Sequence, residues 1–124
     1  MIKLSYEQKI KEITTWLEAL ANPLRLRLFR LLAESDFCVC ELQMLLKVEQ
    51  SRLSHQLRLL RLCGLIEAKE EGRWSVYSMA PRWRKHPLVV ALKESLPLEA
   101  LEKEAIERTK QQSLRLKRLT QTQV

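Results

Sequence analysis

Two cysteines separated by one residue are the strongest chemical signal in this sequence of 124 residues. Cys38 and Cys40 flank Val39 at the start of an apolar segment that is typical of a helix. Thiolates are soft ligands that select thiophilic ions, so two of them at this spacing form a chelating pair. The positive end of a helix dipole is expected to lower both thiol pKa values and favour the thiolates. The pair therefore predicts a site for a thiophilic metal or metalloid ion.

Few other side chains are available to complete such a site. Cys63 is the only further thiol in the sequence. It falls at the carboxyl end of a predicted helix, where the dipole disfavours a thiolate, so we interpret it first as a core residue and second as a third ligand. An odd number of cysteines with no export signal favours reduced thiols in the cytoplasm over a disulfide scaffold.

The cysteine pair opens a helix-turn-helix pattern that covers residues 36–64. A short apolar helix is followed by a turn at residues 47–49 and then by a basic helix that ends at Gly64. Leucines at helical spacing occupy one face of this second helix and leave a polar, basic face, which suits the reading of base edges in a major groove. The residues predicted to contact bases are Gln50, Ser51, Arg52, Ser54 and His55, and those predicted to contact phosphate are Arg58 and Arg73.

The cysteine spacing predicts how ion binding could oppose DNA binding. Residues i and i+2 of a regular helix point about 200° apart, so one ion reaches both sulfurs only if the first helical turn distorts. That turn belongs to the helix that supports the predicted recognition helix. Ion binding and DNA binding would then compete through one bistable element.

The rest of the chain supplies the elements that hold this pattern. Ser5 and Gln8 form a capping box ahead of an amphipathic helix that runs to residue 20. Asn22 and Pro23 are an N-cap and first helical residue for a second helix. Beyond Gly64, residues 65–69 and 74–79 alternate as two strands joined by residues 70–73, with a glycine in the turn, and so predict a hairpin wing.

We therefore predict a mainly α fold with a small β-hairpin wing, that is, a homodimeric winged helix-turn-helix. Residues 1–80 form the DNA-binding core together with an N-terminal dimerisation helix. Residues 81–119 form C-terminal helices that pack beside the first helix and complete the dimer interface, and residues 120–124 form a frayed tail.

Composition agrees with a DNA-binding protein. The formal net charge of +7 and the pI near 9.6 indicate a polyanionic partner. Arg25, Arg27 and Arg30 are interpreted as a solvated face in preference to phosphate contacts. No apolar run approaches the ~18 residues that span a membrane, and no signal for export precedes the first helix. The sequence has no glycine-rich phosphate loop and no nucleophile paired with a base, so an enzyme is not expected.

The sequence resembles the arsenic-repressor (ArsR/SmtB) family of metal- and metalloid-responsive winged-helix repressors. The resemblance covers about residues 16–79. It is carried by five segments in the family's order: 20–27, 38–42, 54–58, 63–66, and 71–73 with Tyr77. It implies a homodimer that binds a double-stranded DNA operator with an inverted repeat and leaves it when an inducer binds.

The resemblance also narrows the inducer. Arsenite-responsive members often carry a third cysteine where this chain has Gln43, and cadmium- and lead-responsive members use cysteines ahead of Cys38 that are missing here. The histidine pattern of zinc-responsive members is absent. These features favour trivalent arsenic or antimony, as arsenite or antimonite, bound by Cys38 and Cys40, with no permanently bound cofactor. Alternatives are a thiol-redox or persulfide-responsive repressor, or a cadmium- or lead-responsive repressor, of the same fold.

Overall fold

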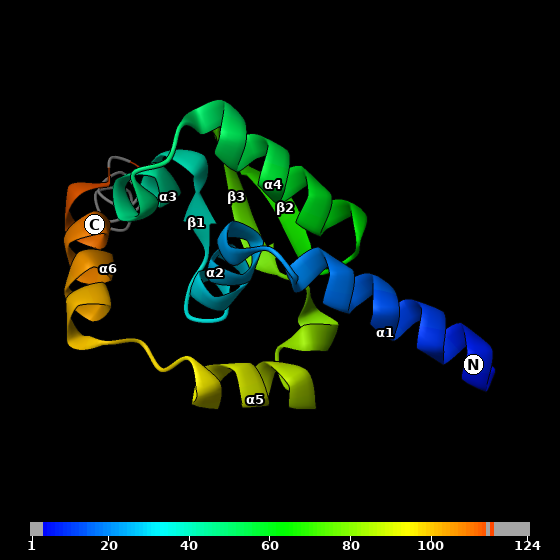
Figure 1. The fold of residues 1–124 in the computed structure, drawn as a ribbon. Coiled ribbons are helices and arrows are strands. Elements are labelled where there is room, and N and C mark those ends of the chain that lie inside the picture. The colour runs from blue at the N-terminus through cyan, green and yellow to red at the C-terminus, as the bar shows by residue number, and fades with distance from the viewer. Residues whose placement is uncertain (1–3, 114, 116–124) are drawn as a thin grey trace.

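The computed structural model describes residues 4–113 and 115, and these form a mainly helical fold with one small antiparallel sheet (Figure 1). This confirms the predicted winged helix-turn-helix. The predicted tail, residues 120–124, lies outside the described residues. The elements are α1 (Tyr6–Leu20), α2 (Pro23–Leu32), β1 (Phe37–Cys38), α3 (Val39–Leu46), α4 (Gln50–Leu62), β2 (Ile66–Glu71), β3 (Trp74–Met79), the 3-10 helix η1 (Pro81–Trp83), α5 (Pro87–Ser95) and α6 (Ala100–Gln112).

The first two helices begin where their caps predict. The Gln8 backbone N–H donates to the Ser5 hydroxyl at 3.2 Å, and the Ser5 N–H donates to the Gln8 side chain at 2.9 Å. Asn22 accepts from two N–H groups of the first turn of α2, which has proline at its first position. These side chains satisfy donors that have no partner inside the helix.

The helix-turn-helix consists of α3, a turn that includes Lys47, and α4. Lys47 has a φ of 54°, in the left-handed region, and its backbone N–H closes the end of α3 by donating to the Gln43 carbonyl. The predicted apolar face of α4 is confirmed, since Leu53, Leu57 and Leu60 are fully buried. Burial of this face against the core fixes which face of α4 is left for solvent.

The sheet has the order β1-β3-β2, one strand more than the predicted hairpin. Gly72 turns the hairpin with a φ of 59°. The additional strand, β1, is only two residues long and pairs Phe37 with Tyr77 and Cys38 with Val76. A strand this short carries no period-2 pattern, so the sequence did not predict it.

The C-terminal helices lie on two different sides of the molecule. Figure 1 shows α6 against α3, at the opposite end of the molecule from α1, and the α3–α6 packing buries Ile106 and Thr109. Within one chain, the prediction that the C-terminal helices pack beside the first helix is therefore wrong for α6. The cause is a long-range contact between the end of this segment and α3, described below.

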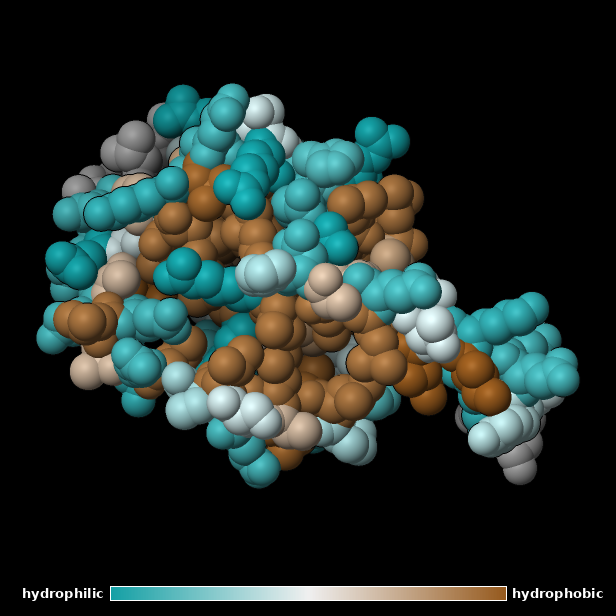
Figure 2. Space-filling view, in the orientation of Figure 1, coloured by the Kyte–Doolittle hydropathy of each residue, from teal (hydrophilic) through white to brown (hydrophobic). Residues whose placement is uncertain are grey.

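Helix α1 projects from the body of the protein (Figure 1). Its exposed apolar side chains can be followed along the projection in the space-filling view (Figure 2). The large hydrophobic residues that α1 leaves exposed include Tyr6, Ile10, Ile13 and Leu17. No helix among residues 4–113 is long and apolar enough to cross a membrane.

Each of the three arginines of α2 binds another part of the chain. Arg25 donates to the Ala19 carbonyl at 2.6 Å and to the Gln56 side chain at 2.8 Å, and so connects α1 and α2 with α4. Arg30 donates to the Leu96 carbonyl at 2.7 Å and is only 6% exposed. The interpretation as a solvated face is therefore wrong for Arg30, because its guanidinium holds the segment between α5 and α6.

Candidate thiol site and nucleic-acid interface

Cys38 and Cys40 face each other at the start of α3, with their sulfurs 2.9 Å apart and both thiols free. Cys38 is the N-cap and has an extended backbone, with φ −86° and ψ 169°, whereas Cys40 lies inside the first turn. The angular separation of residues i and i+2 applies only when both are helical. The prediction that the first turn must distort before one ion can reach both sulfurs is therefore wrong, since the structure already brings the sulfurs together.

The two thiols differ in their exposure to solvent. Cys38 is 2% exposed, whereas Cys40 is exposed. Burial raises the pKa of Cys38 to about 12, and the hydrogen bond with Cys40 and the charge of Glu41 act in the same direction. The prediction that the helix terminus lowers the pKa of Cys38 is therefore wrong. An ion that binds the pair has to displace a firmly held proton from Cys38.

A fully buried carboxylate supports the first turn of α3. Glu41 Oε1 accepts from the Cys38 N–H at 2.8 Å and from Arg115 Nη2 at 3.0 Å, and its Oε2 accepts from the Ser113 hydroxyl. Burial acts to raise the pKa of Glu41, but the hydrogen bonds from Arg115 and Ser113 outweigh it and hold that pKa below the usual value. Neither Glu41 nor Arg115 was predicted from the sequence to take part in the site.

The structure does not bring Cys63 to the pair within one chain. Cys63 is the C-cap of α4 and packs against the hydrophobic core. Gln50, at the other end of this helix, lines the same hollow as the pair, and 13 residues of helix span about 20 Å. Among residues 4–113 and 115, no group of three His, Cys, Asp or Glu side chains is arranged to hold a metal ion.

A surface hollow joins the thiol pair to the two elements predicted to meet DNA. On the side of α3 it is lined by Cys38, Val39, Cys40 and Gln43, on the side of α4 by Gln50, and on the side of the wing by Arg73, Trp74 and Ser75. The Arg73 guanidinium lies 4.7 Å from the centre of the Trp74 ring. Any ion or adduct on the thiols would therefore lie beside the first residue of α4 and the turn of the wing.

The predicted DNA-contacting residues lie on accessible surface. Ser54 is half-buried, and its position on α4 is next to the buried face. Ser51 donates to Glu49 at 2.9 Å, so its hydroxyl already has a partner within the chain. The exposed members are Gln50, Ser51, Arg52, His55, Arg58 and Arg73.

Comparison with known proteins agrees with this architecture. The family model described as "Bacterial regulatory protein, arsR family" matches residues 22–68, which include the thiol pair and all of α4. A transcriptional repressor SmtB homolog from Synechocystis is 43% identical over 70 residues, 56% of this chain and 53% of the relative. The chain belongs to the arsR family.

Other arsR-type proteins are similar to larger parts of the chain. A putative arsenical resistance operon repressor ArsR from Halobacterium salinarum is 40% identical over 81 residues, covering 64% of this chain and 61% of the relative. A solved homodimeric winged helix-turn-helix DNA-binding domain from Mycobacterium bovis, a possible ArsR-family regulator, has a TM-score of 0.62 at 26% identity and covers 80% of this chain and 93% of that one. The chain thus spans about half of the SmtB homolog and about three fifths of the Halobacterium repressor.

Proposed function

We propose that this arsR-family chain is a cytoplasmic, homodimeric transcriptional repressor that binds an inverted-repeat DNA operator and releases it when trivalent arsenic or antimony binds Cys38 and Cys40. The observation that carries the proposal is the shared hollow, which contains both thiols, Gln50 of α4 and Arg73 of the wing. Occupancy of the thiols changes the surroundings of two proposed DNA contacts at once.

The chemistry of the pair suits a trivalent metalloid. Arsenite reaches the site as As(OH)₃, and each thiol replaces one hydroxide while its proton leaves with that hydroxide as water. Two As–S bonds form and two As–O bonds break, with no change in oxidation state. The third position on arsenic keeps a hydroxide, or takes a small thiol or a thiol from the second subunit. Soft sulfur ligands favour this outcome over binding of hard cations, and the name of the Halobacterium relative refers to arsenical resistance.

Two short routes connect the thiols with the DNA-contacting elements. Cys38 pairs with Val76 in β3, the second strand of the wing. Cys40 belongs to α3, which packs directly against α4. A coupling free energy of about 1–3 kcal/mol through these contacts would change operator occupancy by about 5- to 150-fold.

The test is release of DNA measured by fluorescence anisotropy. The probe is a labelled duplex that the protein itself has selected from random sequences. Reduced wild-type protein on this duplex is titrated in parallel with arsenite, antimonite, cadmium, zinc and a persulfide donor. We expect release by arsenite and antimonite near one ion per thiol pair, with weaker effects of the other compounds.

Cysteine variants separate the pair from the remaining thiol. The double variant Cys38→Ser, Cys40→Ser should bind the duplex like the wild type but no longer release it when arsenite or antimonite is added. Cys63→Ser is the matched control and tests the third-ligand prediction, because loss of release in that variant would assign Cys63 of a partner subunit to the site. If arsenite still releases DNA from the double variant, chelation by this pair is excluded.

The 2.9 Å approach of the two sulfurs also supports a second candidate function, a thiol-redox repressor. A disulfide needs the sulfurs at about 2.05 Å, and its formation transfers two electrons to an oxidant, such as a persulfide, while two protons leave. Release by the persulfide donor alone would favour this candidate. Release by cadmium alone would favour a cadmium- or lead-responsive repressor.

A further inference from the structure

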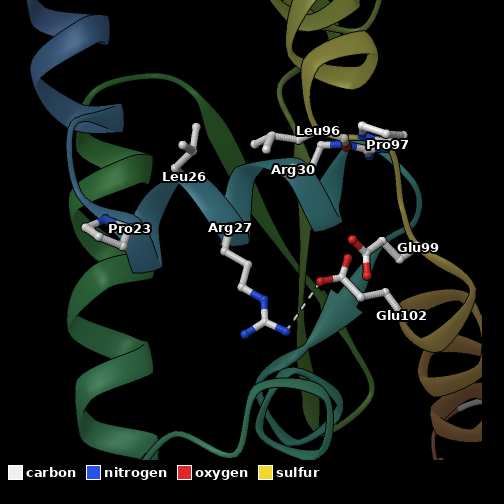
Figure 3. A pocket seen from close by; sticks show the side chains of 8 residues that line it. All are labelled: Pro23, Leu26, Arg27, Arg30, Leu96, Pro97, Glu99 and Glu102. Atoms are coloured by element: carbon white, nitrogen blue, oxygen red, sulfur yellow. Dashed lines mark hydrogen bonds and ion pairs between the residues drawn. The ribbon is translucent and has the colours of Figure 1, made fainter.

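The C-terminal segment of the chain is fixed to the DNA-binding half at both of its ends. At its beginning, Arg30 donates to the Leu96 carbonyl at 2.7 Å. Arg27 lies 3.6 Å from the Glu102 carboxylate, and Figure 3 shows these two side chains pointing toward one another. At its end, Ser113 and Arg115 reach the Glu41 carboxylate. Residues 96–113 and 115 therefore form a strap that packs across α3.

The guanidinium of Arg115 binds three segments that are distant in sequence. It donates to Glu41 in the first turn of α3 at 3.0 Å, to Glu71 at the end of β2 at 3.0 Å, and to the Asp36 carbonyl ahead of β1 at 3.5 Å. Arginine alone offers five N–H donors in a rigid fork that can satisfy several acceptors at once. The side chains of Arg115 and Glu41 are 6% and 0% exposed, so solvent screens this ion pair little, whereas the Glu71 side chain is 38% exposed.

The turn of the wing projects into open space at Gly72. Glu71 is the last residue of β2 and precedes the turn that contains Gly72 and Arg73. A Cβ placed on Gly72 would meet no described atom within 4 Å, so this turn stands in open space. The hydrogen bonds of Arg115 with Glu71 and Glu41 connect the end of β2 with the first turn of the helix that carries the thiols.

We infer that Arg115 is a positioning residue, a strut that fixes the end of the wing relative to the thiol-bearing turn of α3. Cys38 and Arg115 share one acceptor, because the Cys38 N–H and the Arg115 guanidinium both donate to Glu41 Oε1. A shift of Cys38 is thus passed through Glu41 and Arg115 to Glu71. If the proposed function holds, this strut carries part of the coupling between the inducer and DNA, and this last step rests on that function.

The strut is tested by hydrogen–deuterium exchange of the full chain without inducer, in the wild type, Arg115→Gln and Arg115→Lys. In Arg115→Gln we expect amides of residues 69–75 and 37–41 to exchange about tenfold faster or more, since a buried carboxylate loses its cation. Peptides from α2 and α4 should be unchanged. The exchange rates of Arg115→Lys should be intermediate, because lysine restores the charge but not the planar set of N–H donors.

Two further variants keep the test decisive. Glu71→Ala removes only the wing side of the strut, so exchange should rise in residues 69–75 and remain at the wild-type rate in residues 37–41. Arg108→Gln removes an exposed arginine of α6 and is the matched control. The proposed role of Arg115 would be overturned if exchange in the wing were unchanged in Arg115→Gln. It would also be overturned if exchange rose uniformly across the whole chain.

The operator assay separates this inference from the proposed function. If arsenite fails to release DNA from the wild type, the proposed function fails, while the exchange experiment still decides whether the strut exists. If arsenite does release DNA, the factor by which it lowers operator affinity should shrink at least severalfold in Arg115→Gln but not in Arg108→Gln. An unchanged factor would overturn the role of Arg115 in coupling.

Discussion

Cys38 lies directly opposite Val76 in the sheet, so the thiol-bearing residue is a backbone neighbour of the wing. This pairing, together with the core beneath it, keeps the Cys38 side chain 2% exposed. The consequence is a thiol that stays protonated well above the pH at which an unfolded cysteine ionises.

The first prediction is a loss of stability at alkaline pH. The pKa of Cys38 is about 12 in the folded chain against 9.0 as its ordinary value. Below pH 9 the thiol is protonated in both states. Between pH 9 and 12 the unfolded chain loses its proton first, so the free energy of unfolding falls by up to about 1.4 kcal/mol per pH unit.

Urea unfolding between pH 8 and 11 measures this effect. Other groups also titrate in this range, so the quantity to compare is the slope of the wild type against that of Cys38→Ser, which should be shallower. Equal slopes in the two proteins would show that Cys38 is not buried in its protonated form.

The second prediction concerns base recognition by Arg52, which is exposed on α4. If its guanidinium makes a bidentate contact with a guanine, Arg52→Ala should cost about 1–3 kcal/mol of operator binding and relax the base preference at one position. Anisotropy titrations against a set of single-base operator variants measure both effects. Arg61→Ala, at the other end of the same helix, is the control, and equal losses in the two variants would remove Arg52 from the base contacts.

The third prediction concerns Arg25, whose hydrogen bonds connect α4 with α1 and α2. Arg25→Met removes the hydrogen bonds to the Ala19 carbonyl and Gln56 and should lower the free energy of unfolding by about 1–3 kcal/mol. Operator affinity should fall as well, because α4 loses a contact with α2. Arg27→Met is the matched control, since its ion pair with Glu102 is exposed and contributes about 0–1 kcal/mol. Urea unfolding of both variants measures whether the loss of the Arg25 hydrogen bonds lowers the free energy of unfolding more than the loss of the exposed Arg27 ion pair.

The fourth prediction concerns the dimer. Ile13 and Leu17 are 44% and 54% exposed on the projecting α1, as expected of a surface that a second copy covers. The double variant Ile13→Glu, Leu17→Glu should elute as a monomer in size-exclusion chromatography with light scattering and bind the operator more weakly. Thr15→Glu introduces one carboxylate on the opposite side of α1 and should remain dimeric. A monomeric wild type would contradict the prediction directly.

Local signals predicted the parts of the fold that depend on neighbours in sequence. The capping box at Ser5 and Gln8, the cap at Asn22, the buried face of α4 and the turn at Gly72 all formed as their residue types indicate. Each of these features is decided within about one helical turn or one hairpin, so the sequence carries the whole signal.

The geometry of the thiol site depended on details that the sequence does not carry. Moving Cys38 from the first helical turn to the N-cap brings the two sulfurs together, and helix boundaries are uncertain by one or two residues. Burial raises the pKa of Cys38, and the strand that pairs with this residue, at Val76, is distant in sequence. Glu41 stands three residues after Cys38, where a capping-box carboxylate is expected, and this was the one local signal that could have identified it.

The contact between Glu41 and Arg115 also concerns the order in which the protein is assembled. These residues are 74 positions apart, and a ribosome that adds about 5–20 residues per second leaves roughly 4–15 seconds between them. During that interval α3 has no strap across it, and the Glu41 carboxylate is hydrated by water. The thiol site reaches its final form only when Ser113 and Arg115 have been synthesised and have bound Glu41.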